Sequence, residues 1–167
     1  MRKWLAILSL LCLLSSCGKE AKTPFVLPEN ANFLLTADSV KSWKLAKRYN
    51  GSTRMNMGDC FLKYRQRFRE SGTVSDNNAS NRNCGPSLEA DWTFTTAENG
   101  YSYIKLTSDQ LPELLGQEKP GLFFKVLYLT ADSLTVSYVH KQFGERRVIT
   151  DYLVREDLEV PDRDFHW

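Results

Sequence analysis

The cysteines and histidines have the most chemistry to offer in this sequence, and they are few. The chain contains four cysteines and two histidines. They are Cys12, Cys17, Cys60, Cys84, His140 and His166. A zinc site or a redox centre usually needs ligands in a close pattern such as Cys-X-X-Cys, and neither Cys60 nor Cys84 belongs to one. We therefore predict no metal site and no cofactor.

Signatures of catalysis are also scarce. The sequence contains no Gly-X-Ser-X-Gly elbow, no P-loop and no Gly-X-Gly-X-X-Gly motif. A hydrolase could use some of the 20 acidic residues, but no pair stands out by its spacing. His140 continues an apolar face near the end of a predicted strand, where a hydrogen-bonded histidine at a pocket rim is the ordinary interpretation. We predict that the protein is not an enzyme and has no catalytic residues.

The first sixteen residues have the three parts of a secretory signal. Arg2 and Lys3 are followed by an apolar run from Trp4 to Leu14 and then by two serines. This run is too short to cross a bilayer as a helix, which needs about 20 residues. It could instead pack in a protein core, but it would have no polar face there. We predict a signal peptide at residues 1–16 and export of the chain.

The stretch Leu14-Ser15-Ser16-Cys17 resembles the bacterial lipobox. In that family the chain is cut before the cysteine, which then receives a diacylglyceryl group and usually a further acyl chain. The resemblance implies that Cys17 is a lipid anchor. No aspartate follows Cys17, which by similarity to enterobacterial sorting rules implies the outer membrane, on its periplasmic or cell-surface face. The pair Lys19-Glu20 resembles surface-export signals of Bacteroidetes lipoproteins.

Removal of residues 1–16 changes the charge balance. It takes away two of the 22 Lys and Arg residues, which then equal the 20 Asp and Glu residues. A chain with no net positive charge offers no electrostatic case for nucleic-acid binding. Its length fits one domain with a real core. We expect a lipidated linker at 17–33, a single domain at 34–156 and a C-terminal tail at 157–167.

With Cys12 removed and Cys17 acylated, Cys60 and Cys84 remain. The compartment outside the inner membrane permits oxidation, so we predict that they form a disulfide. At their spacing the loop-closure model gives about 3.5 kcal/mol of stabilisation. A redox pair or a metal site is the alternative.

The rest of the chain alternates between short apolar strands and turn formers. We expect a short helix from Thr36, with Thr36 or Asp38 as N-cap. Trp43, Leu45 and Tyr49 then share one face of a first strand, opposite Lys44 and Arg48. The later strands are expected at 62–69, 88–95, 101–106, 122–129, 134–141 and 148–154, with loops at 75–87 and 108–121.

Strands joined mainly by short turns favour an antiparallel meander. Such a meander protects its edges best by closing into a barrel. We predict an all-β, up-and-down barrel of about eight strands with a short N-terminal helix, a size that can hold one small ligand. A β-sandwich is the alternative that the same strands permit.

Residues 34–154 resemble the lipocalin-like domain of Bacteroidetes lipoproteins. The resemblance lies in the order of several short features. They are Trp43, Asp59-Cys60, Phe68, Gly72, Cys84, Trp92-Thr93-Phe94 and the hairpin Leu129–Leu134. Lipocalins proper usually place glycine two residues before the tryptophan, where this chain has Lys41. The family tends to have a tight turn where this chain has residues 108–121, which suggests an elaborated rim or lid. The resemblance implies a fold and a location.

Inward aromatic side chains could bind a small apolar molecule or a glycan in the cup of the barrel. They could equally fill its interior, as we expect for Trp43. The residues that we predict to bind a ligand are Trp92, Phe94, Tyr103, Tyr138 and His140.

Alternate basic residues predict a positive stripe on one strand, formed by Lys63, Arg65, Arg67 and Arg69. This stripe could contact anionic headgroups, lipopolysaccharide or an acidic partner. It could also be an ordinary solvated face, paired with Glu89 and Asp91 on a neighbouring strand. If the outer surface is the functional one, the protein would be a non-catalytic accessory subunit of an outer-membrane protein assembly.

Overall fold

The computed structural model describes residues 23–142 and 145–165. The predicted signal peptide, the predicted lipid anchor Cys17 and His166 lie outside these residues. Within them, no helix combines the length and the hydropathy needed to span a membrane.

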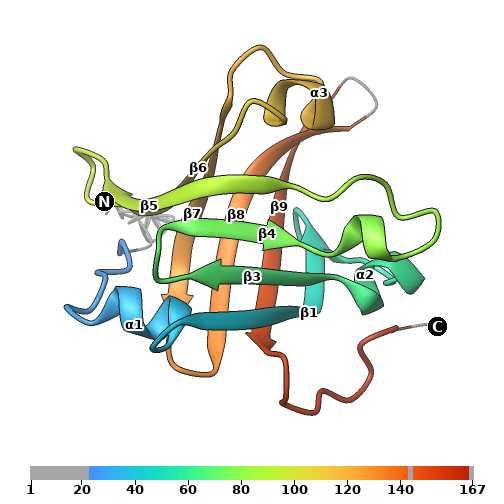
Figure 1. Cartoon of the computed structure of the whole chain (residues 1–167), viewed down its shortest axis with the longest axis horizontal. Coiled ribbons are helices and arrows are strands. Elements are labelled where there is room, and N and C mark those ends of the chain that lie inside the picture. The colour runs from blue at the N-terminus through green and yellow to red at the C-terminus, as the bar shows by residue number, and fades with distance from the viewer. Residues whose placement is uncertain (1–22, 143–144, 166–167) are drawn as a thin grey trace, which may run out of the picture.

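The described chain forms nine strands of one antiparallel sheet and three short α-helices (Figure 1). The strands are β1 (Val40–Asn50), β2 (Thr53–Arg54), β3 (Arg65–Arg69), β4 (Thr73–Asp76), β5 (Glu89–Thr96), β6 (Ser102–Thr107), β7 (Gly121–Leu129), β8 (Ser133–Gln142) and β9 (Glu145–Arg155). The α-helices are α1 (Ala31–Thr36), α2 (Asp59–Lys63) and α3 (Leu111–Leu115), and residues Asn78–Ser80 form a 3-10 turn.

The sheet closes on itself. Neighbouring strands follow chain order from β3 to β9, and β1 pairs with both β3 and β9. Strand β2 pairs only with the end of β1, so the other eight strands make the barrel. This is the predicted up-and-down arrangement, the architecture used by lipocalins. The alternative of a β-sandwich is wrong, because one continuous ladder runs around the molecule.

Helix α1 closes one end of the barrel, which we call the base. Trp43 is fully buried beneath it, and the indole Nε1–H donates to the Leu35 carbonyl at 2.9 Å. Lys41 is also buried, and its ammonium group donates to the carbonyls of Leu34 and Ala131. Burial lowers the pKa of Lys41. The Lys41 side chain therefore ties helix α1 to the β7–β8 turn.

The predicted start of α1 at Thr36 is wrong, because the helix ends there. Ala31, Leu34 and Leu35 have the spacing of one helix face, and this face packs on the core. Ala37 follows with φ of +55°, a left-handed conformation that stops the helix. Phe25 and Leu27 also pack against the core, so part of the predicted linker lies on the barrel.

Strand β1 contains a bulge between Leu45 and Lys47, and the bulge reverses the faces after it. Leu45 and Ala46 are both buried, and Lys47 lies over the outward rings of Tyr49 and Tyr152. The prediction that Tyr49 faces inward and Arg48 outward is therefore wrong. Arg48 faces the barrel interior instead.

The opposite end of the barrel, which we call the mouth, carries α2, residues 77–88 and α3 (Figure 1). The strand predicted from Leu62 is shorter than expected, because Leu62 and Lys63 belong to α2. Strand β4 was not predicted, and its last two residues, Ser75 and Asp76, lie within the loop that was expected at 75–87. The loop expected at residues 108–121 contains the short helix α3.

Candidate ligand pocket at the barrel mouth

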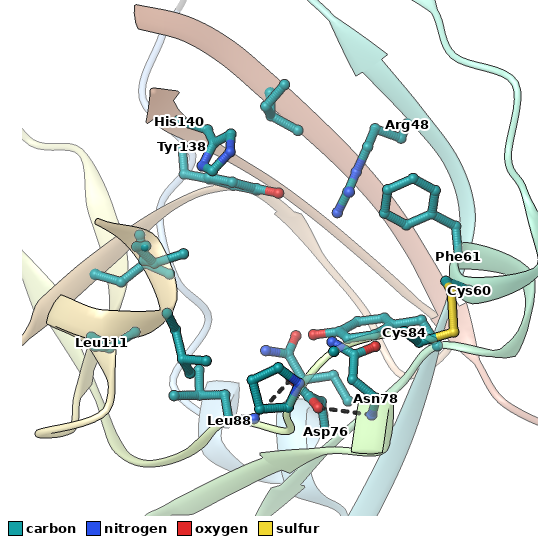
Figure 2. Close-up of a pocket in the computed structure, with 18 of the residues that line it drawn as sticks. Arg48, Cys60, Phe61, Asp76, Asn78, Cys84, Leu88, Leu111, Tyr138 and His140 are labelled. Atoms are coloured by element: carbon teal, nitrogen blue, oxygen red, sulfur yellow. Dashed lines mark hydrogen bonds between the residues drawn. A yellow bond between two sulfur atoms is a disulfide. The ribbon is translucent and has the colours of Figure 1, made fainter. Parts of the chain in front are cut away.

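The mouth encloses a cavity of about 540 Å³, which we call the mouth pocket. Side chains from strands β1, β3, β4, β7, β8 and β9 form its inner wall. Figure 2 shows α3 on one side of the pocket and α2 with residues 83–86 on the other. The core beneath is solid, with Trp43, Phe68 and Ile104 all fully buried. The barrel is thus filled at its base and hollow at its mouth.

The apolar part of the wall comes mainly from α3 and β7. Leu111, Leu114 and Leu115 of α3 line the pocket, as do Leu122 and Phe124 of β7. Helix α3 is short, and a leucine at every third or fourth position gives it one apolar face. The segment between β6 and β7, which the sequence suggested as an elaborated rim or lid, therefore forms an apolar wall of the pocket.

A disulfide forms the facing side of the mouth. Cys60 and Cys84 are bonded, with their Cα atoms 5.4 Å apart, as predicted. Both line the mouth pocket (Figure 2). The bond joins α2 to the loop before β5, two segments without regular pairing to one another. It holds the wall opposite α3 in place.

A charged network crosses the strands beside the pocket. Arg48 donates from Nε and Nη2 to the two carboxylate oxygens of Asp151, at 2.6 and 2.7 Å. Tyr138 donates its hydroxyl hydrogen to the same carboxylate at 3.3 Å. Arg48 also lies over the Phe61 ring, 4.5 Å from its centre. Figure 2 shows Arg48 and Tyr138 pointing toward one another from β1 and β8, the two strands that flank β9.

Burial governs the ionisation of the groups in this network. It raises the pKa of the Tyr138 phenol, and the neighbouring Asp151 carboxylate raises it further. Burial also raises the pKa of Tyr64, which lines the same pocket beside Asp76. For Arg48, burial opposes the charge, but the bonds to Asp151 outweigh it and raise the pKa. The two phenols are therefore neutral hydrogen-bonding groups, and Arg48 is a permanent cation.

Two further polar side chains lie deeper along the wall. The Asp76 carboxylate accepts hydrogen bonds from the backbone N–H groups of Asn78 and Leu88, at 3.0 and 3.3 Å. Gln66 on β3 is only 6% exposed and lines the pocket. Asp76 thus fixes the loop at the mouth, and Gln66 forms part of the cavity wall.

The structure separates the five predicted ligand residues into two groups. Tyr138 and His140 line the mouth pocket. Trp92 and Phe94 lie below it in the core, where Trp92 packs edge-on against Phe94 and donates from Nε1 to the Arg69 carbonyl. The prediction for Tyr103 is wrong as to face, because Ser102 and Ile104 are the buried neighbours and Tyr103 packs on Phe123 outside.

The predicted basic stripe is also altered. Arg65, Arg67 and Arg69 follow one another on the outer face of β3, but Lys63 belongs to α2 and pairs with Asp59. Arg65 pairs with Glu156 at 2.8 Å. The expected pairing with Glu89 and Asp91 is wrong, because β4 lies between β3 and β5. The stripe is a partly neutralised outer surface.

Sequence reasoning missed Arg48, Gln66, Asp76 and Asp151. One signal was present in the sequence. Asp151 falls between Ile149 and Leu153 on the inward face of an apolar strand, and a carboxylate there demands a buried partner. No comparable signal marks Gln66. Among the described residues, no group of three or more His, Cys, Asp or Glu side chains is placed to hold a metal ion.

Comparison with known proteins finds similarity of fold to solved structures and little sequence similarity. No family model matches the chain, and no curated protein sequence matches it significantly. A solved structure of a lipocalin-like protein from Bacteroides uniformis is similar over 68% of this chain and 94% of its own chain. The sequence identity is 16% and the TM-score is 0.45.

Proposed function

We propose that this protein is a lipid-anchored envelope lipoprotein that binds a small ligand in the mouth pocket of its barrel. The observation that carries this proposal is the cavity of about 540 Å³ with its mainly apolar lining. Small-molecule sites typically have volumes of about 300–1,000 Å³ and apolar walls with a few fixed polar groups. Arg48, Tyr138 and Gln66 are such groups. No catalytic role is proposed for them.

Two adjacent residues on β8 provide a matched test of ligand binding. His140 lines the mouth pocket, and Val139 faces outward with 49% of its surface exposed. We expect the wild type to increase the fluorescence of N-phenyl-1-naphthylamine, an uncharged apolar dye. His140→Trp should weaken dye binding at least tenfold by filling the mouth, whereas Val139→Trp should change it less than twofold. Equal effects of the two variants would place the dye on the outer surface and contradict the proposal.

The anchor at Cys17 belongs to the same proposal and has its own test. The support for it is the apolar run from Trp4 to Leu14 followed directly by the lipobox-like residues. Mass spectrometry of the protein extracted from its own envelope should find Cys17 as the first residue, carrying acyl groups. A bare thiol at this position would overturn the anchor and would leave ligand binding unaffected.

A role as accessory subunit of an outer-membrane assembly is the second candidate. It is favoured by exposed apolar side chains on the outer face, where Val139 and Val148 lie opposite each other and are 49% and 52% exposed. A stoichiometric membrane partner that binds the wild type with an empty pocket, and that Val139→Trp releases, would favour this role over ligand binding.

A further inference from the structure

The charges around the mouth pocket leave no excess of positive charge. Arg48 lines the pocket, but two of its nitrogens already donate hydrogen bonds to the Asp151 carboxylate. Asp76 is the other charged side chain in the lining, and the backbone N–H groups of Asn78 and Leu88 already donate to its carboxylate, which leaves it no free position for a ligand ammonium group. A ligand carboxylate entering this pocket would lose its hydration without gaining an unpaired cation.

Gln66 is the polar group best placed to recognise a ligand. The next inward residue of β3, Phe68, is fully buried, so Gln66 lies where the pocket meets the core. Among residues 23–142 and 145–165, no side chain or backbone group forms a hydrogen bond with its amide. An amide both donates and accepts, and it therefore matches a hydroxyl, carbonyl or amide group that carries no charge. Neither amide atom of Gln66 is among the fully buried polar atoms without a partner, so both keep accessible surface and a ligand group can reach them.

We infer that the mouth pocket takes an uncharged amphipathic ligand and discriminates against one with a free carboxylate. The hydrocarbon body of the ligand lies against the leucines of α3 and Phe124, and its neutral polar end pairs with Gln66. This inference rests on the proposed ligand-binding function and specifies the chemical class of the ligand.

Three ten-carbon compounds with different end groups test this inference at pH 7.4. They are 1-decanol, decanoate and decylamine, each used to displace N-phenyl-1-naphthylamine from the wild-type protein. We expect decanol to displace the dye at a concentration at least tenfold lower than either charged compound. Equal or tighter binding of decanoate or of decylamine would overturn the inference while leaving the ligand-binding function standing. Failure of the dye and of all three compounds to bind would overturn both.

Two variants then assign the selectivity to its residues. Asp151→Asn removes the carboxylate that neutralises Arg48. It should raise the affinity for decanoate relative to that for decanol at least tenfold. Asp91→Asn is the matched control, because Asp91 is exposed on the outer face of β5 and should leave the ratio unchanged. Gln66→Leu should weaken the binding of decanol at least fivefold and should change the binding of the dye little. An unchanged decanol affinity in Gln66→Leu would remove Gln66 from the site.

Discussion

Replacement of Asp151 by asparagine is expected to lower the free energy of unfolding by about 3–5 kcal/mol. The side chains of Arg48 and Asp151 are only 16% and 10% exposed, and they share two short hydrogen bonds. Without Asp151, Arg48 remains charged in a site that provides no other anion at hydrogen-bond distance among the described residues. Urea unfolding followed by tryptophan fluorescence measures the loss.

Two controls separate this effect from a general loss of charge. Asp132→Asn breaks the exposed pair between Asp132 and Arg155, and it should cost less than about 1 kcal/mol. The double variant Arg48→Met/Asp151→Leu removes both charges and should lie near the wild type, because a buried pair gains little over apolar side chains of similar volume. If Asp151→Asn costs no more than Asp132→Asn, water in the pocket solvates Arg48 and the pair is not a structural requirement.

Removal of the disulfide should have the second large effect on stability. The free energy of unfolding of the variant Cys60→Ala/Cys84→Ala is expected to be about 3.5 kcal/mol lower than that of the wild type. The reason is that the unfolded chain regains the conformational freedom of the loop between the two residues. The native strands should persist, since the bond lies among loops outside the barrel ladder. Urea unfolding measures stability, and far-ultraviolet circular dichroism checks the strand content.

The wild-type protein under reducing conditions is the natural control for the double variant. It should lose a similar amount of stability and regain it on reoxidation. Dye binding should also weaken in both samples, since the bond fixes the pocket wall formed by α2 and residues 83–86. A loss below about 1 kcal/mol would mean that this loop is already restricted in the unfolded chain.

Strict alternation made most of the barrel predictable from the sequence. In β5, Ala90 and Trp92 are buried and alternate with exposed neighbours, as expected. The faces of β1 could not be predicted in the same way, because a bulge inserts one residue and exchanges inside and outside beyond it. The apolar Tyr49 favoured the wrong register, whereas its ring actually packs on Tyr152 outside the barrel.

The pocket was less predictable than the fold, because its parts come from segments far apart in sequence. Arg48 and Asp151 are opposite one another across the β1–β9 pairing and 103 residues apart in the chain. The position of Asp151 signals a buried partner, but Arg48 looks like an ordinary surface charge until the barrel brings the two together. The size of the cavity depends on α2, α3 and the loop after β4, and their positions are set by tertiary packing rather than by local pattern.

The tail beyond β9 holds β1 and α2 together, a role that its charged sequence did not predict. Arg163 donates from Nε to the Leu45 carbonyl at the β1 bulge and from Nη2 to the Leu62 carbonyl of α2. A bulge locally disrupts the hydrogen bonds between strands. Here the Arg163 guanidinium, distant in sequence, forms hydrogen bonds with both the bulged strand and the helix.

The pairing of β1 with β9 also has a consequence for biosynthesis. The first barrel strand to leave the ribosome must wait for the last one before its second edge is covered. Until then the nascent polypeptide is an open sheet with an unpaired edge on β1. Intermediates with unpaired strand edges are prone to aggregate. Closure of so distant a pairing is intrinsically slow. A holding chaperone that shields β1 during translation would therefore benefit this protein more than one whose neighbouring strands are all close in sequence.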